Sequence, residues 1–138
     1  MASSADPEGM GPAHLTGHAR DQWDDRTPPD TIDPWHALAL STHIRGLHRH
    51  SWIRGQGDHK ASAVYGYGGV AWCGVEYYVV FLEVDQPDGS SAIVTAYQPE
   101  HYQVYDRVVR EVERAGGPID EAQYSPHNEH IATFYHHD

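Results

Sequence analysis

The amino-acid sequence predicts an α+β domain, in which two N-terminal helices pack on a curved antiparallel sheet and a further helix follows. Apolar residues recur at helical spacing near the N-terminus and again between residues 100 and 115, whereas residues 61–97 are rich in β-branched and aromatic residues. The helices precede and follow the strands instead of alternating with them, which favours an antiparallel sheet. The length of 138 residues suits one such domain.

We expect residues 12–117 to form this domain. Residues 1–11 are mostly Ser, Asp, Gly and Pro, which predicts a disordered tail, and they lack the basic start and apolar stretch of a signal peptide. Residues 118–138 are weakly patterned and form a C-terminal extension whose structure the sequence does not define, with residues 131–135 as a candidate edge strand.

The first helix is predicted from Pro12 to Asp25, because proline suits a first helical turn and Thr27-Pro-Pro cannot continue the helical hydrogen bonds. Leu15, Ala19 and Trp23 form its apolar stripe.

The second helix has a clear beginning. Asp33 is a favourable N-cap and Pro34 suits the first helical position. Its apolar stripe runs from Trp35 to Leu47, where Gly46 weakens the end.

The centre of the chain predicts three strands, over Ala61–Tyr67, Val75–Asp85 and Ser91–Tyr97. Gly68-Gly69 indicates a turn, and Gln86-Pro-Asp-Gly indicates a hairpin turn because Asp-Gly supplies the required backbone angles. The strand at 75–85 is apolar on both faces, which is typical of a central strand covered on both sides. A last helix is predicted over Glu100–Ala115 and ends at Gly116-Gly-Pro.

The charge of the chain bears on its partners. Twenty acidic residues stand against nine basic ones, of which only Lys60 is lysine, and the net charge is −11. This composition indicates a halophilic archaeal source, with an ordinary acidic protein as the alternative. An acidic chain repels phosphate groups. In molar salt this repulsion is screened over about 3 Å, so a local basic patch can still bind phosphate.

No apolar run approaches the roughly 20 residues that a membrane helix needs, so we expect no membrane partner. The single cysteine, Cys73, excludes an internal disulfide and favours a cytoplasmic location.

A basic segment spans residues 43–60 inside this acidic chain, with Trp52 between its charges. A positive segment with an aromatic residue that can stack on a base is typical of single-stranded RNA binding, and a flexible charged loop is the alternative. The residues predicted to bind RNA here are Arg45, Arg49, Trp52, Arg54 and Lys60.

Two motifs stand about seventy residues apart, His18-Ala-Arg-Asp-Gln-Trp-Asp-Asp-Arg26 and Ala92-Ile-Val-Thr-Ala-Tyr97. Across residues 14–100 this pair resembles the RelE-like (BECR) small toxin nucleases, those with the pattern HxxxRxxxR followed by ITVY. The resemblance implies a RelE-like α+β fold and a ribonuclease that needs no metal or cofactor. It also implies the toxin of a toxin–antitoxin pair, with free or ribosome-bound mRNA as substrate and an antitoxin as protein partner.

The same resemblance implies site residues. His18 serves as acid or base, Arg26 binds phosphate, and Tyr97 donates to the leaving oxygen or orients the phosphate, with Thr95 beside it on one strand face. Gln22 stands where the family pattern has arginine. It is included among the RNA contacts, but the lost charge favours binding without cleavage.

Ordinary structural roles exist for each residue: a surface histidine at His18, a helix-dipole partner at Arg26, and strand residues at Thr95 and Tyr97. Three functions therefore stay open. They are a toxin-like ribonuclease, a non-catalytic RNA- or protein-binding module, and a metal-binding protein. The third would use the histidine pairs His48-x-His50, His127-x-x-His130 and His136-His137, although no metal site is assigned.

Overall fold

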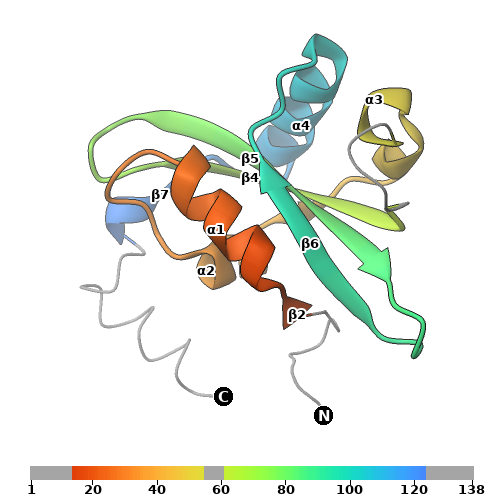
Figure 1. Ribbon diagram of the computed structural model, residues 1–138. Coiled ribbons are helices and arrows are strands. Elements are labelled where there is room, and N and C mark those ends of the chain that lie inside the picture. Colours follow the sequence, from red (N-terminus) through yellow and green to blue (C-terminus); the bar gives the residue numbers. More distant parts are fainter. Residues whose placement is uncertain (1–13, 55–60, 124–138) are drawn as a thin grey trace.

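The computed structural model describes residues 14–54 and 61–123, and Figure 1 shows how their helices and strands are arranged. These residues contain a six-stranded sheet whose main path runs β2-β6-β5-β4-β3, with β7 paired to β4. The strands are β2 (His14–Leu15), β3 (Thr42–His43), β4 (Ala63–Val70), β5 (Glu76–Asp85), β6 (Ser91–Tyr97) and β7 (Ile119–Asp120).

Helices cover both faces of this sheet. They are α1 (Gly17–Arg26), α2 (Pro34–Ala39), α3 (Ser51–Arg54), α4 (Tyr102–Arg114) and the 3-10 turns η1 (Leu47–Arg49) and η2 (Glu121–Gln123). Residues of α1 and α2 belong to the core on one face, and residues of α4, η1 and α3 belong to the core on the other. The α+β class is confirmed. The sheet is mixed rather than purely antiparallel, because β2 and β7 each pair in parallel with a longer strand.

The central meander β4-β5-β6 is antiparallel and carries both cores. On the α1 face, Trp23 stacks on Phe81 with ring centroids 5.7 Å apart and planes at 8°. Tyr67 and Tyr77 lie against the same indole, each at 6.1 Å. Trp23 is 1% exposed, so α1 is held to the sheet by an aromatic cluster.

A β-bulge in β6 changes which face its residues meet. Leu82 pairs with Thr95, but the next residue of β5, Glu83, pairs with Ile93, so Val94 is the extra residue. Ile93 therefore lies in the α1 core, whereas Tyr97 lies in the α4 core, although both are odd-numbered. Bulges of this kind commonly redirect side chains next to functional sites. Thr95 and Tyr97 share one face, as predicted.

The turn predicted at Gly68-Gly69 is wrong, because β4 continues through both residues to Val70. A Cβ on Gly68 would lie 2.6 Å from the Tyr78 ring and 2.9 Å from Val112 of α4. The glycine is needed for close helix–strand packing, and the actual turn follows at Gly74, where φ is +88°.

Two helix predictions need correction. The first helix begins at Gly17, not Pro12, because Thr16 caps it by accepting from the Ala19 N–H and His14 and Leu15 pair with β6. The second helix ends at Ala39 instead of continuing toward Leu47, since the chain there turns into β3.

Other local predictions are confirmed. Asp33 caps α2 by accepting from the His36 N–H at 3.0 Å. In the β5–β6 hairpin, Gly89 has φ +91° and the Asp88 carboxylate accepts from the Ser90 N–H. Gly116 ends α4 at φ +105°. The predicted N-terminal tail and the candidate strand at 131–135 lie outside the described residues.

The segment after α4 returns to the sheet through a buried carboxylate. Glu121 is fully buried, and one of its oxygens accepts from the hydroxyls of Tyr67, at 2.6 Å, and Tyr77. Its other oxygen accepts from the Ile32 N–H at 3.1 Å. A Cβ on Gly69 would lie 2.4 Å from this carboxylate, so the glycine makes room for it. Residues 119–123, which the sequence placed in a separate extension, are therefore packed into the predicted domain.

Candidate functional site

One cavity of about 460 Å³ brings together residues that are distant in the sequence. Its described lining residues are Arg26, Trp52, Tyr97, Gln98 and Glu100. Three of them, Arg26, Trp52 and Tyr97, were singled out from the sequence. The volume lies within the range of about 300–1,000 Å³ that is typical of small-molecule sites.

The cavity forms where α1 and β6 end side by side. The Gln22 side-chain oxygen accepts from the Ala96 N–H at 3.0 Å, and the Gln98 amide donates to the Arg26 carbonyl at 2.5 Å. These two bonds join the predicted motifs. Glutamine at position 22 can accept a backbone N–H, whereas arginine has no acceptor. The departure from the family pattern therefore has a structural use here, and Gln22 is an anchor between helix and strand.

Tyr97 lines the cavity and has a buried hydroxyl. The residue is 7% exposed, and its hydroxyl has no hydrogen-bond partner among the described residues. Burial raises the pKa of Tyr97 to about 12, so the phenol stays protonated near neutral pH and is a hydrogen-bond donor. A buried polar group without a partner calls for an explanation.

Arg26 gives the cavity a cation. It lies in the last turn of α1 and is exposed, and no described carboxylate forms an ion pair with its guanidinium. Glu100 on the same lining provides acceptor oxygens. The cavity therefore combines a forked donor, a phenol donor and carboxylate and amide acceptors.

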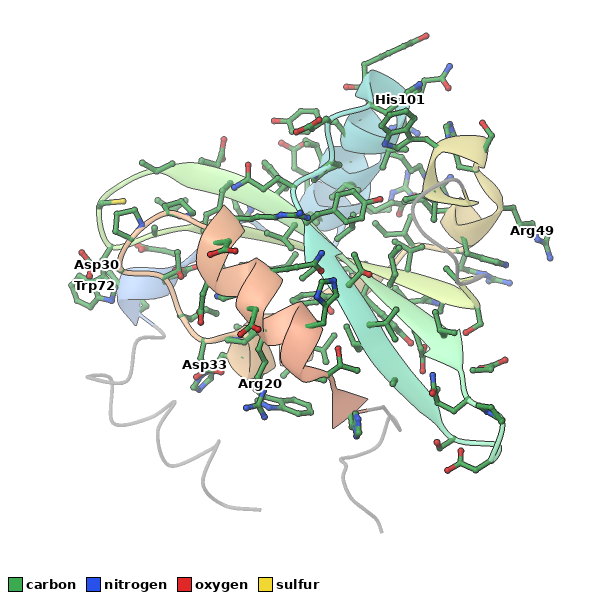
Figure 2. The ribbon with its side chains drawn as sticks, viewed as in Figure 1. Arg20, Asp30, Asp33, Arg49, Trp72 and His101 are labelled. Carbon is green, nitrogen blue, oxygen red and sulfur yellow. The ribbon has the colours of Figure 1, made fainter. Side chains whose placement is uncertain are left out.

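Trp52 is held in place at the edge of the cavity. Its ring lies 5.3 Å from that of His101, and the backbone N–H of Trp52 donates to the Nδ1 of His50 at 3.1 Å. The Nε2 of His50 lies 3.1 Å from the side-chain oxygen of Gln103, which connects α3 to α4. Figure 2 shows His101 at the N-terminal end of α4. The sequence did not single out His101 as a site residue, although it comes four positions after Tyr97.

Two predicted catalytic residues do not line the cavity among the described residues. His18 is exposed on α1, and its Cα precedes that of Arg26 by roughly 12 Å along the helix axis, at 1.5 Å per residue. Thr95 is half-buried on the same strand face as Tyr97. The structure thus brings Arg26 and Tyr97 together without His18.

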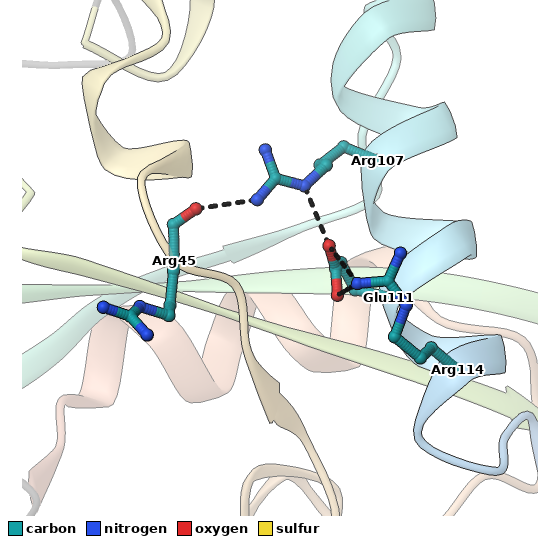
Figure 3. Close-up of polar contacts among 4 residues, drawn as sticks. All are labelled: Arg45, Arg107, Glu111 and Arg114. Atoms are coloured by element: carbon teal, nitrogen blue, oxygen red, sulfur yellow. Dashed lines mark hydrogen bonds and ion pairs between the residues drawn. The ribbon is translucent and has the colours of Figure 1, made fainter.

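Of the remaining predicted RNA contacts, Arg45 lies beside α4. Arg45 and Arg49 are exposed, the side chain of Arg54 is not described, and Lys60 lies outside the described residues. Figure 3 shows how Arg107 binds this segment: its Nη2 donates to the Arg45 carbonyl at 2.8 Å. Its Nε also donates to Glu111 at 3.1 Å, and Arg114 shares that carboxylate. One carboxylate therefore lies between two guanidinium groups.

The metal prediction gains no support from the described residues. Residues 14–54 and 61–123 contain no group of three His, Cys, Asp or Glu side chains that could hold a metal ion. The histidine pairs at 127–130 and 136–137 lie outside these ranges. Within the same ranges, no helix has the length and apolar character needed to cross a bilayer.

No family model matches the chain, and no curated protein or solved structure is found to be similar to it. The RelE-like resemblance therefore depends on the two motifs alone and stays a prediction.

Proposed function

We propose that this protein binds single-stranded RNA, with one nucleotide in the cavity. The observation that carries the proposal is the meeting of Arg26, Trp52 and Tyr97 at one cavity of suitable volume. These three side chains come from α1, α3 and β6 and offer the three contacts that a nucleotide requires.

Each group has a distinct use for a nucleotide. The guanidinium of Arg26 matches two phosphate oxygens, and Trp52 offers a π face to an unpaired base. The Tyr97 hydroxyl donates to a phosphate or base oxygen. The acceptors of Gln98 and Glu100 can bind the amino groups of a base edge. Unpaired bases are needed because a paired base has neither its face nor its edge free.

The charge distribution supports an anionic ligand at this side of the molecule. The chain carries −11 overall, and Asp21, Asp24 and Asp25 are exposed on α1. Arg26 instead lines the cavity, and Arg45 and Arg49 are exposed in the segment that Arg107 of α4 binds. Because phosphate binding weakens as salt rises, affinity is to be compared at low and at molar KCl.

Metal-independent RNA cleavage is the second candidate function. It is favoured by the meeting of Arg26 with Tyr97, as the family resemblance implies. A protonated phenol can protonate a leaving oxygen, and the guanidinium can stabilise charge on phosphorus. The toxin role and an antitoxin partner belong to this second candidate.

The first experiment measures binding of a labelled single-stranded RNA by fluorescence anisotropy, with a duplex of the same sequence for comparison. Arg26→Ala is expected to weaken binding by about tenfold or more, since a charged hydrogen bond contributes about 1.5–3 kcal/mol. Arg20→Ala is the matched control, because Arg20 is also exposed on α1 but does not line the cavity (Figure 2). Equal losses in both variants would point to non-specific attraction and contradict the cavity as the binding site.

The second experiment incubates the same RNA with the protein in EDTA and follows the products on a gel. Cleavage that is lost in Arg26→Ala and Tyr97→Phe, and kept in His18→Ala, would establish a nuclease centred on the cavity. Loss in His18→Ala as well would restore the site that the sequence predicts. Binding without cleavage would leave the non-catalytic module.

A further inference from the structure

Three aromatic rings at the edge of the cavity form a stack. The ring of His101 lies 5.3 Å from Trp52 at an interplanar angle of 31° and 5.1 Å from Tyr102 at 19°. His101 therefore contacts both Trp52 and Tyr102, and we call this chain of three contacting rings the column.

The column is held from two elements. His101 is the N-cap of α4, and its Nδ1 accepts from the Gln103 N–H at 3.3 Å. The ring of His50 packs edge-on against His101 at 5.3 Å, and the same ring accepts from the backbone N–H of Trp52. The rings are thus oriented before any ligand arrives, which reduces the entropy that binding must cost.

The column lies at the surface although its rings are large. Tyr102 is 68% exposed and Trp52 is 40% exposed, so their stacking does not serve to fill the core. One end of the column, Trp52, lines the cavity, and the other end, Tyr102, presents a ring face on the side away from His101. Exposed, preoriented aromatic faces are what sequence-tolerant binding of unpaired bases uses.

On the basis of the function proposed above, we propose that the Tyr102 end of this column is a second base-binding subsite. One base of the RNA stacks on Trp52 in the cavity and another stacks on Tyr102. The ligand is therefore an unpaired oligonucleotide rather than a free mononucleotide.

A base on Trp52 and a base on Tyr102 would belong to one oligonucleotide. Affinity should therefore rise from a mononucleotide to a tetranucleotide.

The test compares a nucleoside monophosphate with a single-stranded tetranucleotide, using isothermal titration calorimetry. We expect the wild type to bind the tetranucleotide at least about tenfold more tightly, from the contribution of one further stacked base. Tyr102→Leu should remove most of that gain and leave mononucleotide binding unchanged, whereas Tyr102→Phe should keep it. Trp72→Leu is the control, since Trp72 is 49% exposed at the β4–β5 turn.

The outcomes separate the two proposals. If Arg26→Ala weakens tetranucleotide binding but Tyr102→Leu does not, the second subsite is wrong and the cavity remains the binding site. Equal affinity of the wild type for the two ligands would also overturn the subsite. If the wild type binds neither ligand at low or molar KCl, the proposed function fails and the subsite fails with it.

Discussion

The two faces of the sheet bury the same chemical group in different ways. On the α1 face, the phenols of Tyr67 and Tyr77 donate to the buried carboxylate of Glu121. On the α4 face, the phenol of Tyr97 has no partner among the described residues and lies at a cavity. Burial raises the pKa of all three, and Glu121 raises those of Tyr67 and Tyr77 further.

The difference separates a structural polar group from a functional one. A buried donor without a partner costs about 1–3 kcal/mol, so it persists only where something offsets that cost. At Glu121 the donors and acceptors are matched within the fold, which leaves nothing for a ligand to bind. At Tyr97 the donor is unmatched among the described residues, and the residue lines the cavity.

The largest effect is expected from Glu121→Ala. This variant leaves two phenol hydroxyls and the Ile32 N–H without their acceptor, each at about 1–3 kcal/mol, so we expect a loss of roughly 3 kcal/mol or more in the free energy of unfolding. Urea denaturation measures it. Glu100→Ala is the matched control, because that carboxylate is exposed and should change stability by less than about 0.5 kcal/mol. A loss below about 1 kcal/mol for Glu121→Ala would mean that the carboxylate is not the structural centre of this face.

Removing single phenol hydroxyls should give opposite signs on the two faces. Tyr67→Phe breaks a 2.6 Å bond to a carboxylate, so we expect it to destabilise the fold by about 1.5–3 kcal/mol. Tyr97→Phe removes an unmatched donor and should leave stability unchanged or raise it by about 1 kcal/mol.

The Tyr97→Phe variant should also weaken RNA binding about fivefold, the equivalent of roughly 1 kcal/mol for one neutral hydrogen bond. Denaturation and anisotropy on the same preparations test both parts. If Tyr97→Phe destabilises as much as Tyr67→Phe, the contrast between the two faces disappears.

Alkaline pH should weaken the fold through these same phenols. Because folding raises the pKa of Tyr97 from about 10 to about 12, its contribution is fully present below pH 10 and is lost as pH rises toward 12. Tyr67 and Tyr77 act in the same direction. We expect stability to fall above pH 10 in the wild type and less steeply in Tyr97→Phe, followed by urea denaturation at each pH. Identical slopes would show that Tyr97 does not resist ionisation in the folded state.

Local signals in the sequence were sufficient for some elements and not for others. Asp33-Pro34 and the Pro-Asp-Gly hairpin turn are correct because a cap or turn depends on a few adjacent residues. The two-residue parallel strands β2 and β7 were not predictable, since their pairing depends on long-range contacts. The glycines of β4 suggested a turn because close packing by α4 leaves no local signal.

The candidate site was likewise predicted only in part. Arg26, Tyr97 and Trp52 were found from motif and composition, and they do meet at one cavity. The bulge at Val94, which turns Tyr97 toward α4, depends on register with β5 and has no local sign in the sequence. His18 was placed in the site by the family resemblance, but it lies roughly 12 Å before Arg26 along the axis of α1 and does not line the cavity.

The smallest effect on stability is expected from a substitution of Asp33. Its carboxylate has hydrogen-bond partners, as that of Glu121 does, but it is half-exposed. Its carboxylate accepts from the His36 N–H at 3.0 Å and contacts the His36 imidazole at 2.6 Å. Burial alone would raise the pKa of Asp33, but these contacts with His36 outweigh it and lower the pKa overall. Stability from a lowered carboxyl pKa is present above the ordinary pKa of about 4 and is lost as pH falls through the lowered value.

Asp33→Ala should therefore cost about 0.5–2 kcal/mol at neutral pH, the usual contribution of an N-cap, and the cost should shrink toward pH 3. Urea denaturation at the two pH values measures it, with Asp24→Ala on the exposed face of α1 as the control. A cost that does not change with pH would mean that the cap acts through shape rather than charge. Asp33 would then be a third case beside Glu121 and Tyr97: a polar group with satisfied hydrogen bonds whose contribution to stability does not depend on its ionisation.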